Sequence, residues 1–141
     1  WHDWTRLKQH PEIYRFAHGL IAFRRAHPLL SKEQFYTDAE IEWFGPQGGL
    51  PAWPDPQGRR FGCLIHEAEQ GALYLMFNAG DDAVEFALPV APPGARWHLA
   101  VDTGGEAERD LFAAGKESLL DDAQAYRVGA RCSAILVARQ S

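Results

Sequence analysis

Residues 61–78 read FGCLIHEAEQGALYLMFN, two apolar runs separated by a polar stretch. Each run, 61–67 and 72–78, has the length of a typical strand, and the polar residues between them end in a glycine. The pattern predicts two β-strands joined by a turn at 68–71, and therefore a fold built mainly from strands.

Short apolar segments on either side of this stretch extend the prediction. Residues 83–88 alternate, with Val84, Phe86 and Leu88 on one face. The other segments of strand length are 41–44, 96–101, 126–128 and 132–138. Residues 45–58 contain four prolines and four glycines and are expected to form a loop. Turn signals between so many short strands indicate a mostly β fold, an antiparallel sandwich or barrel, with 106–121 left unassigned.

One helix is predicted before the strands, over about 11–27. Pro11 suits the first helical position, and Phe16, Leu20 and Phe23 contribute to a broad apolar stripe. Pro28 ends the helix. The helix either packs on the sandwich or is the last helix of a preceding domain.

The bulk composition excludes several kinds of partner. The chain has 141 residues and a formal net charge of -5, without a dense basic run, so we expect no nucleic-acid partner. No apolar run approaches the roughly 18 residues of a membrane span, so we expect no membrane partner. The chain opens with Trp1 and its one methionine is Met76, which suggests a piece of a longer protein.

Two acidic pairs, Asp81–Asp82 and Asp121–Asp122, are the candidates for carboxylate chemistry. Both fall in predicted turns, where aspartate supports local backbone hydrogen bonds, and neither has the spacing of a calcium-binding loop. We therefore assign no catalytic residue, no metal ligand and no cofactor.

Histidines and cysteines are expected to have structural roles. The histidines have no metal-ligand spacing; they are His2, His10, His18, His27, His66 and His98. Cys63 and Cys132 lie in strand-like runs, and we favour two buried free thiols over a disulfide.

Tryptophans are the remaining candidates for ligand contact, because the face of an indole ring can stack on a sugar. Trp43 and Trp97 lie in predicted strands and are expected in the core. Trp53 lies in the loop 45–58 and is the candidate carbohydrate contact. Trp1 and Trp4 are expected to pack against a preceding domain.

Several segments resemble, in order, the C-terminal part of glycogen debranching enzymes and isoamylases of the α-amylase superfamily. FAHGLIAFRRAHPLL at 16–30 is similar to the last helix of the catalytic barrel, which reads LI..R..HP.L in that family. The other similar segments are WHDW at 1–4, Phe35, IEWF with Gly45, Pro46 and Gly48, LYLMFNA at 73–79, FALP at 86–89 and WHLAVDT at 97–103. Two stretches depart from the family pattern: Pro51-Ala52-Trp53 replaces an acidic pair before a tryptophan, and 104–121 match no family segment.

This resemblance implies an enzyme that hydrolyses α-1,6 branch linkages in glycogen by a retaining mechanism, which needs two carboxyl groups about 5 Å apart. None of the family's carboxylate motifs is present, so the chain alone is expected to be inactive. The implied domains are 1–30, the last helix of a (β/α)8 barrel, and 31–141, a C-terminal β-sandwich.

The leading hypothesis is accordingly a non-catalytic accessory domain of a cytoplasmic glycogen debranching enzyme. Its partners would be the catalytic barrel of the same parent chain and, through that parent, glycogen or another α-glucan. Two alternatives remain: an autonomous carbohydrate-binding module that uses Trp53, or an interaction domain that offers the Phe16, Leu20 and Phe23 surface of its helix.

Overall fold

The two central runs form neighbouring antiparallel strands in the computed structural model, which describes residues 3–55, 58–67 and 71–140. They are β2 (Arg60–Glu67) and β3 (Gly71–Asn78), and their register places Phe61 opposite Phe77 and Cys63 opposite Leu75. Of the predicted turn at 68–71, residues 68–70 lie outside the described residues, as do Trp1 and His2.

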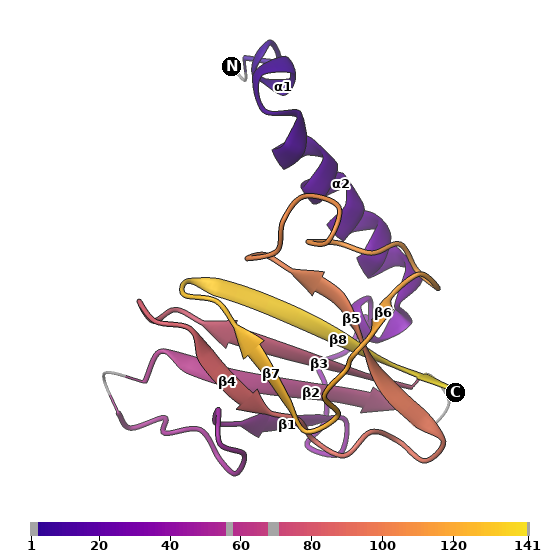
Figure 1. Cartoon of the computed structure of the whole chain (residues 1–141). Helices are drawn as coiled ribbons and strands as arrows, with labels where there is room; N and C mark the ends of the chain where they lie inside the picture. Colours follow the sequence, from indigo (N-terminus) through magenta and orange to yellow (C-terminus); the bar gives the residue numbers. More distant parts are fainter. Residues whose placement is uncertain (1–2, 56–57, 68–70, 141) are drawn as a thin grey trace.

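A six-stranded antiparallel sheet forms the centre of the molecule, in the order β1-β2-β3-β8-β5-β6 (Figure 1). Its other strands are β1 (Ile41–Phe44), β8 (Cys132–Gln140), β5 (Ala95–Asp102) and β6 (Ser118–Leu119). A second sheet pairs β4 (Val84–Ala87) with β7 (Ala125–Val128). The predicted antiparallel β-sandwich is confirmed, and every predicted strand is present with ends shifted by at most two residues. Only β6, inside the unassigned segment, was not predicted.

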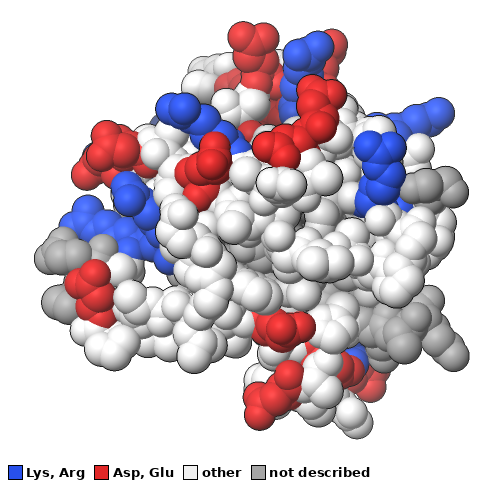
Figure 2. Space-filling view, turned by 60° about the horizontal axis from the view of Figure 1, so that its bottom comes forward, with Lys and Arg blue, Asp and Glu red and all other residues white. Residues whose placement is uncertain are grey.

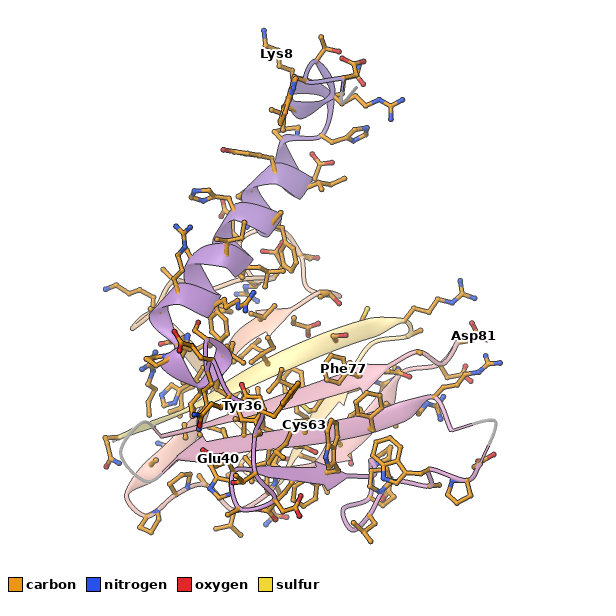
Figure 3. All side chains as sticks on the ribbon, turned by 180° about the vertical axis from the view of Figure 1, so that it is seen from behind. Lys8, Tyr36, Glu40, Cys63, Phe77 and Asp81 are labelled. Carbon is orange, nitrogen blue, oxygen red and sulfur yellow. The ribbon has the colours of Figure 1, made fainter. Side chains whose placement is uncertain are left out.

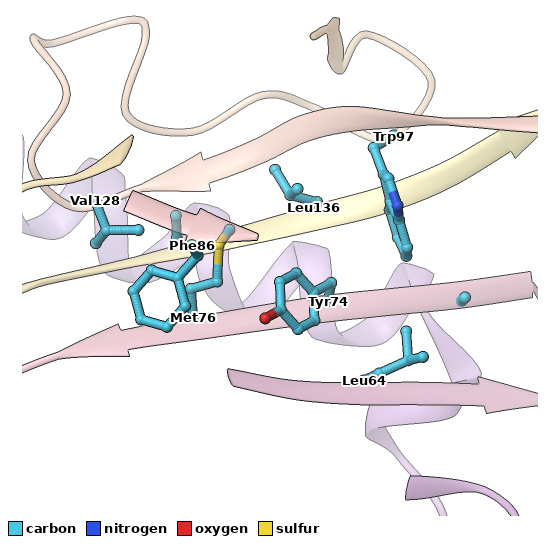
Figure 4. Close-up of a cluster of buried hydrophobic side chains, with 9 residues drawn as sticks. Leu64, Tyr74, Met76, Phe86, Trp97, Val128 and Leu136 are labelled. Atoms are coloured by element: carbon cyan, nitrogen blue, oxygen red, sulfur yellow. The ribbon is translucent and has the colours of Figure 1, made fainter. Parts of the chain in front are cut away.

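The inter-sheet core fills the space between the two sheets (Figure 4). Phe86 of β4, at 0% exposure, lies among Tyr74, Met76 and Leu136 of the large sheet. Val84 and Leu88 pack against the same cluster, as the alternation of 83–88 predicted. Its buried members are Leu64, Ala72, Tyr74, Met76, Phe86, Trp97, Val128, Ala134 and Leu136. Burial of these apolar side chains is the main stabilising contribution to the sandwich.

The helix-side core covers the opposite face of the large sheet. Helices α1 (Arg6–Gln9), α2 (Pro11–Ala26) and η1 (Pro28–Leu30) precede the strands, and α2 begins at Pro11 and ends one residue before the predicted His27. Phe23 of α2 and Leu29 of η1 are buried there, and Phe16 and Leu20 pack against them. The cluster's buried members are Phe23, Leu29, Cys63, Ile65, Leu73, Ala100, Val101 and Val137.

The unassigned segment also holds α2 in place. Leu111 forms an isolated bridge with Val101 at the edge of the sheet, and its side chain lies against Gly19 of α2. A Cβ atom at Gly19 would lie 2.0 Å from Leu111 Cδ2, so any larger residue there would displace the Leu111 side chain. Arg15 of α2 donates a hydrogen bond to Asp110 beside it. Residues 104–121, whose role the sequence did not indicate, therefore fix α2 to the sheet.

Candidate functional site

An aromatic cluster of Trp43, Trp53, Phe61 and Phe77 extends the helix-side face of the sheet beyond the area that α2 covers. Phe61 alternates with Cys63 and Ile65 on β2, so it lies on the same face as these two core residues. The ring centroids of Trp43 and Trp53 are 5.6 Å apart, and those of Phe61 and Phe77 are 5.0 Å apart. Figure 3 shows this face, with Phe77 farther than Cys63 from the C-terminal end of α2.

The predictions for the three strand and loop tryptophans have different outcomes. Trp97 is 4% exposed and its indole N–H donates to the carbonyl of Pro89 at 2.8 Å, as expected of a core residue. Trp43 is 39% exposed, so its assignment to the core is wrong. The reason is its position on the edge strand β1, opposite Cys63 but beyond the reach of α2. Trp53, the candidate carbohydrate contact, is 59% exposed.

Trp53 also lines a pocket of about 430 Å³ that adjoins the aromatic cluster. One side of the pocket is formed by residues 46–55 and 58–61, and the other by the turn after β3. The lining residues are Pro46, Pro51, Ala52, Trp53, Asp55, Gly58, Arg59, Arg60, Phe61, Gly80, Asp81 and Asp82. Of these, only Trp53 was predicted to contact a ligand. Phe61 and Phe77 could have been found only from the register that places them opposite one another.

Charged groups at the pocket bind one another. Arg131 donates from Nε to Asp81 Oδ1 at 2.9 Å, and Arg59 Nη1 lies 3.9 Å from Asp81 Oδ2. Arg60 donates from Nε to the side-chain oxygen of Asn78 at 3.2 Å. The pocket therefore presents polar groups of both signs rather than a concentration of one charge.

The aspartates of the two acidic pairs make local contacts. Asp81 is 61% exposed at its side chain and is ion-paired with two arginines. Asp122 accepts a hydrogen bond from the backbone N–H of Gln124 at 2.7 Å, the turn-forming role that was predicted for it. Asp102, which was not singled out, accepts from the Tyr126 hydroxyl at 2.7 Å, and burial together with this carboxylate raises the pKa of Tyr126.

The histidines take part in local contacts. His27 is 7% exposed, stacks on Phe23 at a centroid distance of 4.1 Å, and its Nδ1 lies 2.8 Å from the Phe23 carbonyl. His98 Nδ1 lies 2.9 Å from the Arg96 carbonyl, and His66 Nε2 lies 3.2 Å from Glu42. Within 3–55, 58–67 and 71–140, no three His, Cys, Asp or Glu side chains are grouped so that they could hold a metal ion.

Both cysteines are free thiols, as predicted. Cys63 is 5% exposed, and burial raises its pKa to about 11. Cys132 is only partly buried, contrary to the prediction for it, because it lies at the start of β8, where its thiol donates to the carbonyl of Ala130.

A second surface lies between α1 and the N-terminal half of α2. Leu7, Ile13 and Tyr14 are 41%, 63% and 56% exposed, and together with Trp4 they line a groove of about 680 Å³. By contrast Phe16, Leu20 and Phe23, the surface first considered for a partner protein, pack against the sheet of the same chain. Phe23 is therefore buried within the chain and cannot contact a partner protein, whereas Phe16 and Leu20 are partly buried.

A helix packed on one face of an antiparallel sandwich defines the class of a mostly β domain. In the described part of the chain, no helix is long and apolar enough to cross a membrane.

Comparison with known proteins assigns the family. The family described as "Isoamylase, C-terminal" matches residues 40–137, more than half of the chain, and the chain belongs to this family. It is 28% identical to an isoamylase of Pseudomonas amyloderamosa, and the aligned region covers 87% of this chain and 17% of that relative. It is 32% identical to the chloroplastic isoamylase SU1 of Zea mays over 77% of its length, 13% of that relative. An isoamylase of Flavobacterium is 27% identical over 99% of the chain. The chain thus spans about a fifth or less of these relatives.

Proposed function

We propose that this chain is the C-terminal accessory part of a debranching enzyme of the isoamylase type. In this proposal residues 1–30 are the last helix of the catalytic barrel, and 31–141 are a β-sandwich that supports the barrel without supplying a catalytic group. The boundary is supported by the family match, which begins at residue 40, after α2 and η1, and a longer parent enzyme is supported by the chain covering 17% of the Pseudomonas isoamylase.

The observation that carries the proposal is that α2 has two apolar sides. One side, with Phe23 at 5% exposure, is buried in the helix-side core. The other side leaves Tyr14 and Ile21 more than half exposed, and Ile13, which the helical repeat places on the Phe23 side, is 63% exposed at the end of α2 that extends beyond the sheet (Figure 1). An amphipathic helix of a self-contained domain has one apolar stripe and one polar face. A second exposed stripe therefore supports a neighbouring domain, and the proposal identifies it as the rest of the barrel.

The substrate proposed for the parent enzyme is glycogen or a related α-glucan. Retaining hydrolysis requires a nucleophilic carboxylate and an acid on barrel loops. The ion-paired Asp81 and the turn-forming Asp122 do not offer such a pair. The two free thiols support a reducing compartment, for which we propose the cytoplasm.

The first test is hydrolysis by the chain alone. Purified chain incubated with glycogen should release no reducing ends above the blank, while an isoamylase assayed beside it should release them readily. Release by the chain that scales with its concentration and persists through repeated purification would contradict the accessory role.

The second test concerns the exposed apolar residues of α2. Ile13→Asp should leave the urea midpoint of the chain alone unchanged, because Ile13 is 63% exposed. In a longer protein that carries a catalytic barrel before this chain, the same change should lower thermal stability and debranching activity, since it would place a charge in an apolar interface. Equal activity and stability of the altered and unaltered longer proteins would contradict the interface, and Glu12→Gln is the matched control.

A further inference from the structure

The aromatic cluster presents a preformed apolar platform. Trp43 and Trp53 remain 39% and 59% exposed, although their rings contact each other at 5.6 Å with an interplanar angle of 75°. The ring of Phe61 packs against both indoles, with its centroid 5.8 Å from that of Trp53 and 5.9 Å from that of Trp43. Two exposed indole rings that pack on the partly buried ring of Phe61 are costly to hydrate and are typical of a binding surface.

The loop that carries Trp53 is held by its own backbone hydrogen bonds. Gly45 N–H donates to the Gly49 carbonyl at 2.9 Å, Asp55 N–H to Ala52 at 3.0 Å and Gly58 N–H to Asp55 at 2.8 Å. The Pro46 carbonyl accepts from Ala87 N–H at 2.8 Å, which ties the loop to β4. A side chain held in position in this way loses little conformational entropy when a ligand binds.

The pocket beside Trp53 adds hydrogen-bonding groups at one end of this platform. Its volume of about 430 Å³ lies in the range of about 300–1,000 Å³ common for small-molecule sites. The carboxylate of Asp81 and the guanidinium of Arg59 are paired, so they offer donors and acceptors without a large unbalanced charge. Figure 2 shows the lower face of the molecule with acidic and basic side chains intermixed around its rim and a neutral centre.

These features fit an uncharged, polyhydroxylated ligand. A sugar ring has an apolar face that can stack on an indole, and hydroxyl groups around its edge that can bond to charged side chains. A nucleic acid would need a concentration of positive charge, which a chain of net charge -5 does not provide. We propose that the aromatic cluster and the adjoining pocket bind glucose units of an α-glucan chain, with Trp53 as the stacking platform. The choice of glucan rests on the function proposed above.

The test measures binding by the chain directly. Electrophoresis in native gels with increasing glycogen should retard the chain, and maltoheptaose, added as a soluble linear α-1,4-glucan, should compete with this retardation. Trp53→Ala should weaken glycogen binding about tenfold or more, as expected when a central aromatic contact is removed. Arg59→Ala, at the polar end, should weaken it by a smaller factor. Trp4→Ala is the matched control, because Trp4 is 73% exposed on the other surface and should leave binding unchanged.

Folding is checked separately, since circular dichroism and the urea midpoint of Trp53→Ala should equal those of the unaltered chain. Three outcomes would overturn the inference: no retardation of the unaltered chain, equal retardation of Trp53→Ala, or retardation of the chain alone but not of a longer isoamylase-type protein that contains it. The last outcome would mean that a neighbouring domain covers the aromatic cluster. None of them affects the accessory role, which fails only through the hydrolysis and α2 tests described with it.

Discussion

Asn78 is the chain's single asparagine and is 2% exposed at the end of β3. Its amide donates to the carbonyls of Asp82 at 2.8 Å and Gly129 at 2.7 Å, and its oxygen accepts from Gly80 N–H at 3.0 Å. One side chain thus satisfies backbone groups of the turn after β3 and of the turn between β7 and β8. The turn after β3 carries Asp81 and Asp82, which line the pocket beside Trp53, so Asn78 also fixes one side of that pocket.

Asn78→Ala should destabilise the chain by about 3 kcal/mol, because it leaves buried backbone donors and acceptors without partners. The measurement is the free energy of unfolding from urea titration. Gln47→Ala, at an exposed loop position, is the control and should stay within about 0.5 kcal/mol. A loss no larger than that of the control would show that these hydrogen bonds do not stabilise the turn.

Removing the polar group of Tyr74, unlike that of Asn78, is not expected to destabilise the chain. Tyr74 is 0% exposed, burial raises its pKa to about 12, and its hydroxyl has no hydrogen-bond partner among the described residues. Tyr74→Phe removes this buried polar group and keeps the ring packed against Phe44 and Trp97. Urea titration should therefore give an unchanged or higher free energy of unfolding. A loss of about 1 kcal/mol or more would mean that the hydroxyl is satisfied.

The carboxyl group of Glu40 should make the stability of the folded chain depend on pH. It accepts hydrogen bonds from Lys32 and from the N–H and hydroxyl of Thr37, which lower its pKa from 4.5 to about 2. A carboxyl whose pKa is lower in the folded chain stabilises it above the unfolded pKa, and this stabilisation is lost as the pH falls from about 4.5 to about 2. The stability difference between the unaltered chain and Glu40→Gln should therefore be present at pH 7 and shrink through that range. Urea midpoints at several pH values measure it, with exposed Glu33→Gln as control; a difference independent of pH would contradict this role.

At the scale of elements, the strands were predictable because alternation and turn residues are local properties of the sequence. The strand 83–88 is an example, since Val84, Phe86 and Leu88 do face the inter-sheet core. What was not local could not be predicted. Trp43 was predicted to lie in the core because the sequence does not show that β1 is an edge strand. The sequence also does not show which part of the sheet α2 covers. The pocket beside Trp53 depends on a loop and a turn that only the folded sheet brings together.

The buried and the exposed apolar residues of α2 should differ in their contribution to stability. Phe23→Ala removes a side chain that is 5% exposed and stacks on His27, and should cost about 3 kcal/mol. Ile13→Ala, on the same helix at 63% exposure, should change stability by no more than about 0.5 kcal/mol. Urea titration of both variants tests this contrast. Equal losses would mean that α2 does not pack on the sheet through Phe23.

For the whole molecule, the contacts described above make α2 part of the folding unit of the sandwich. The helix-side core joins Phe23 to Leu73 and Val137 of the two central strands. Leu111 and the Arg15–Asp110 pair add a second attachment near the middle of the helix. A helix of 16 residues has little stability alone in water, so its persistence depends on these contacts.

Helix and sheet should therefore unfold together. In urea, ellipticity at 222 nm, which reports mainly on α2, and the near-ultraviolet signal of buried Trp97 should give one coincident transition, as expected for a single small domain. Leu111→Ala should lower both midpoints together, because its side chain contacts α2 while its backbone pairs with Val101. Loss of the helical signal at a lower urea concentration than the tryptophan signal would contradict this coupling. It would mean that α2 attaches to the sandwich only when the rest of a barrel is present.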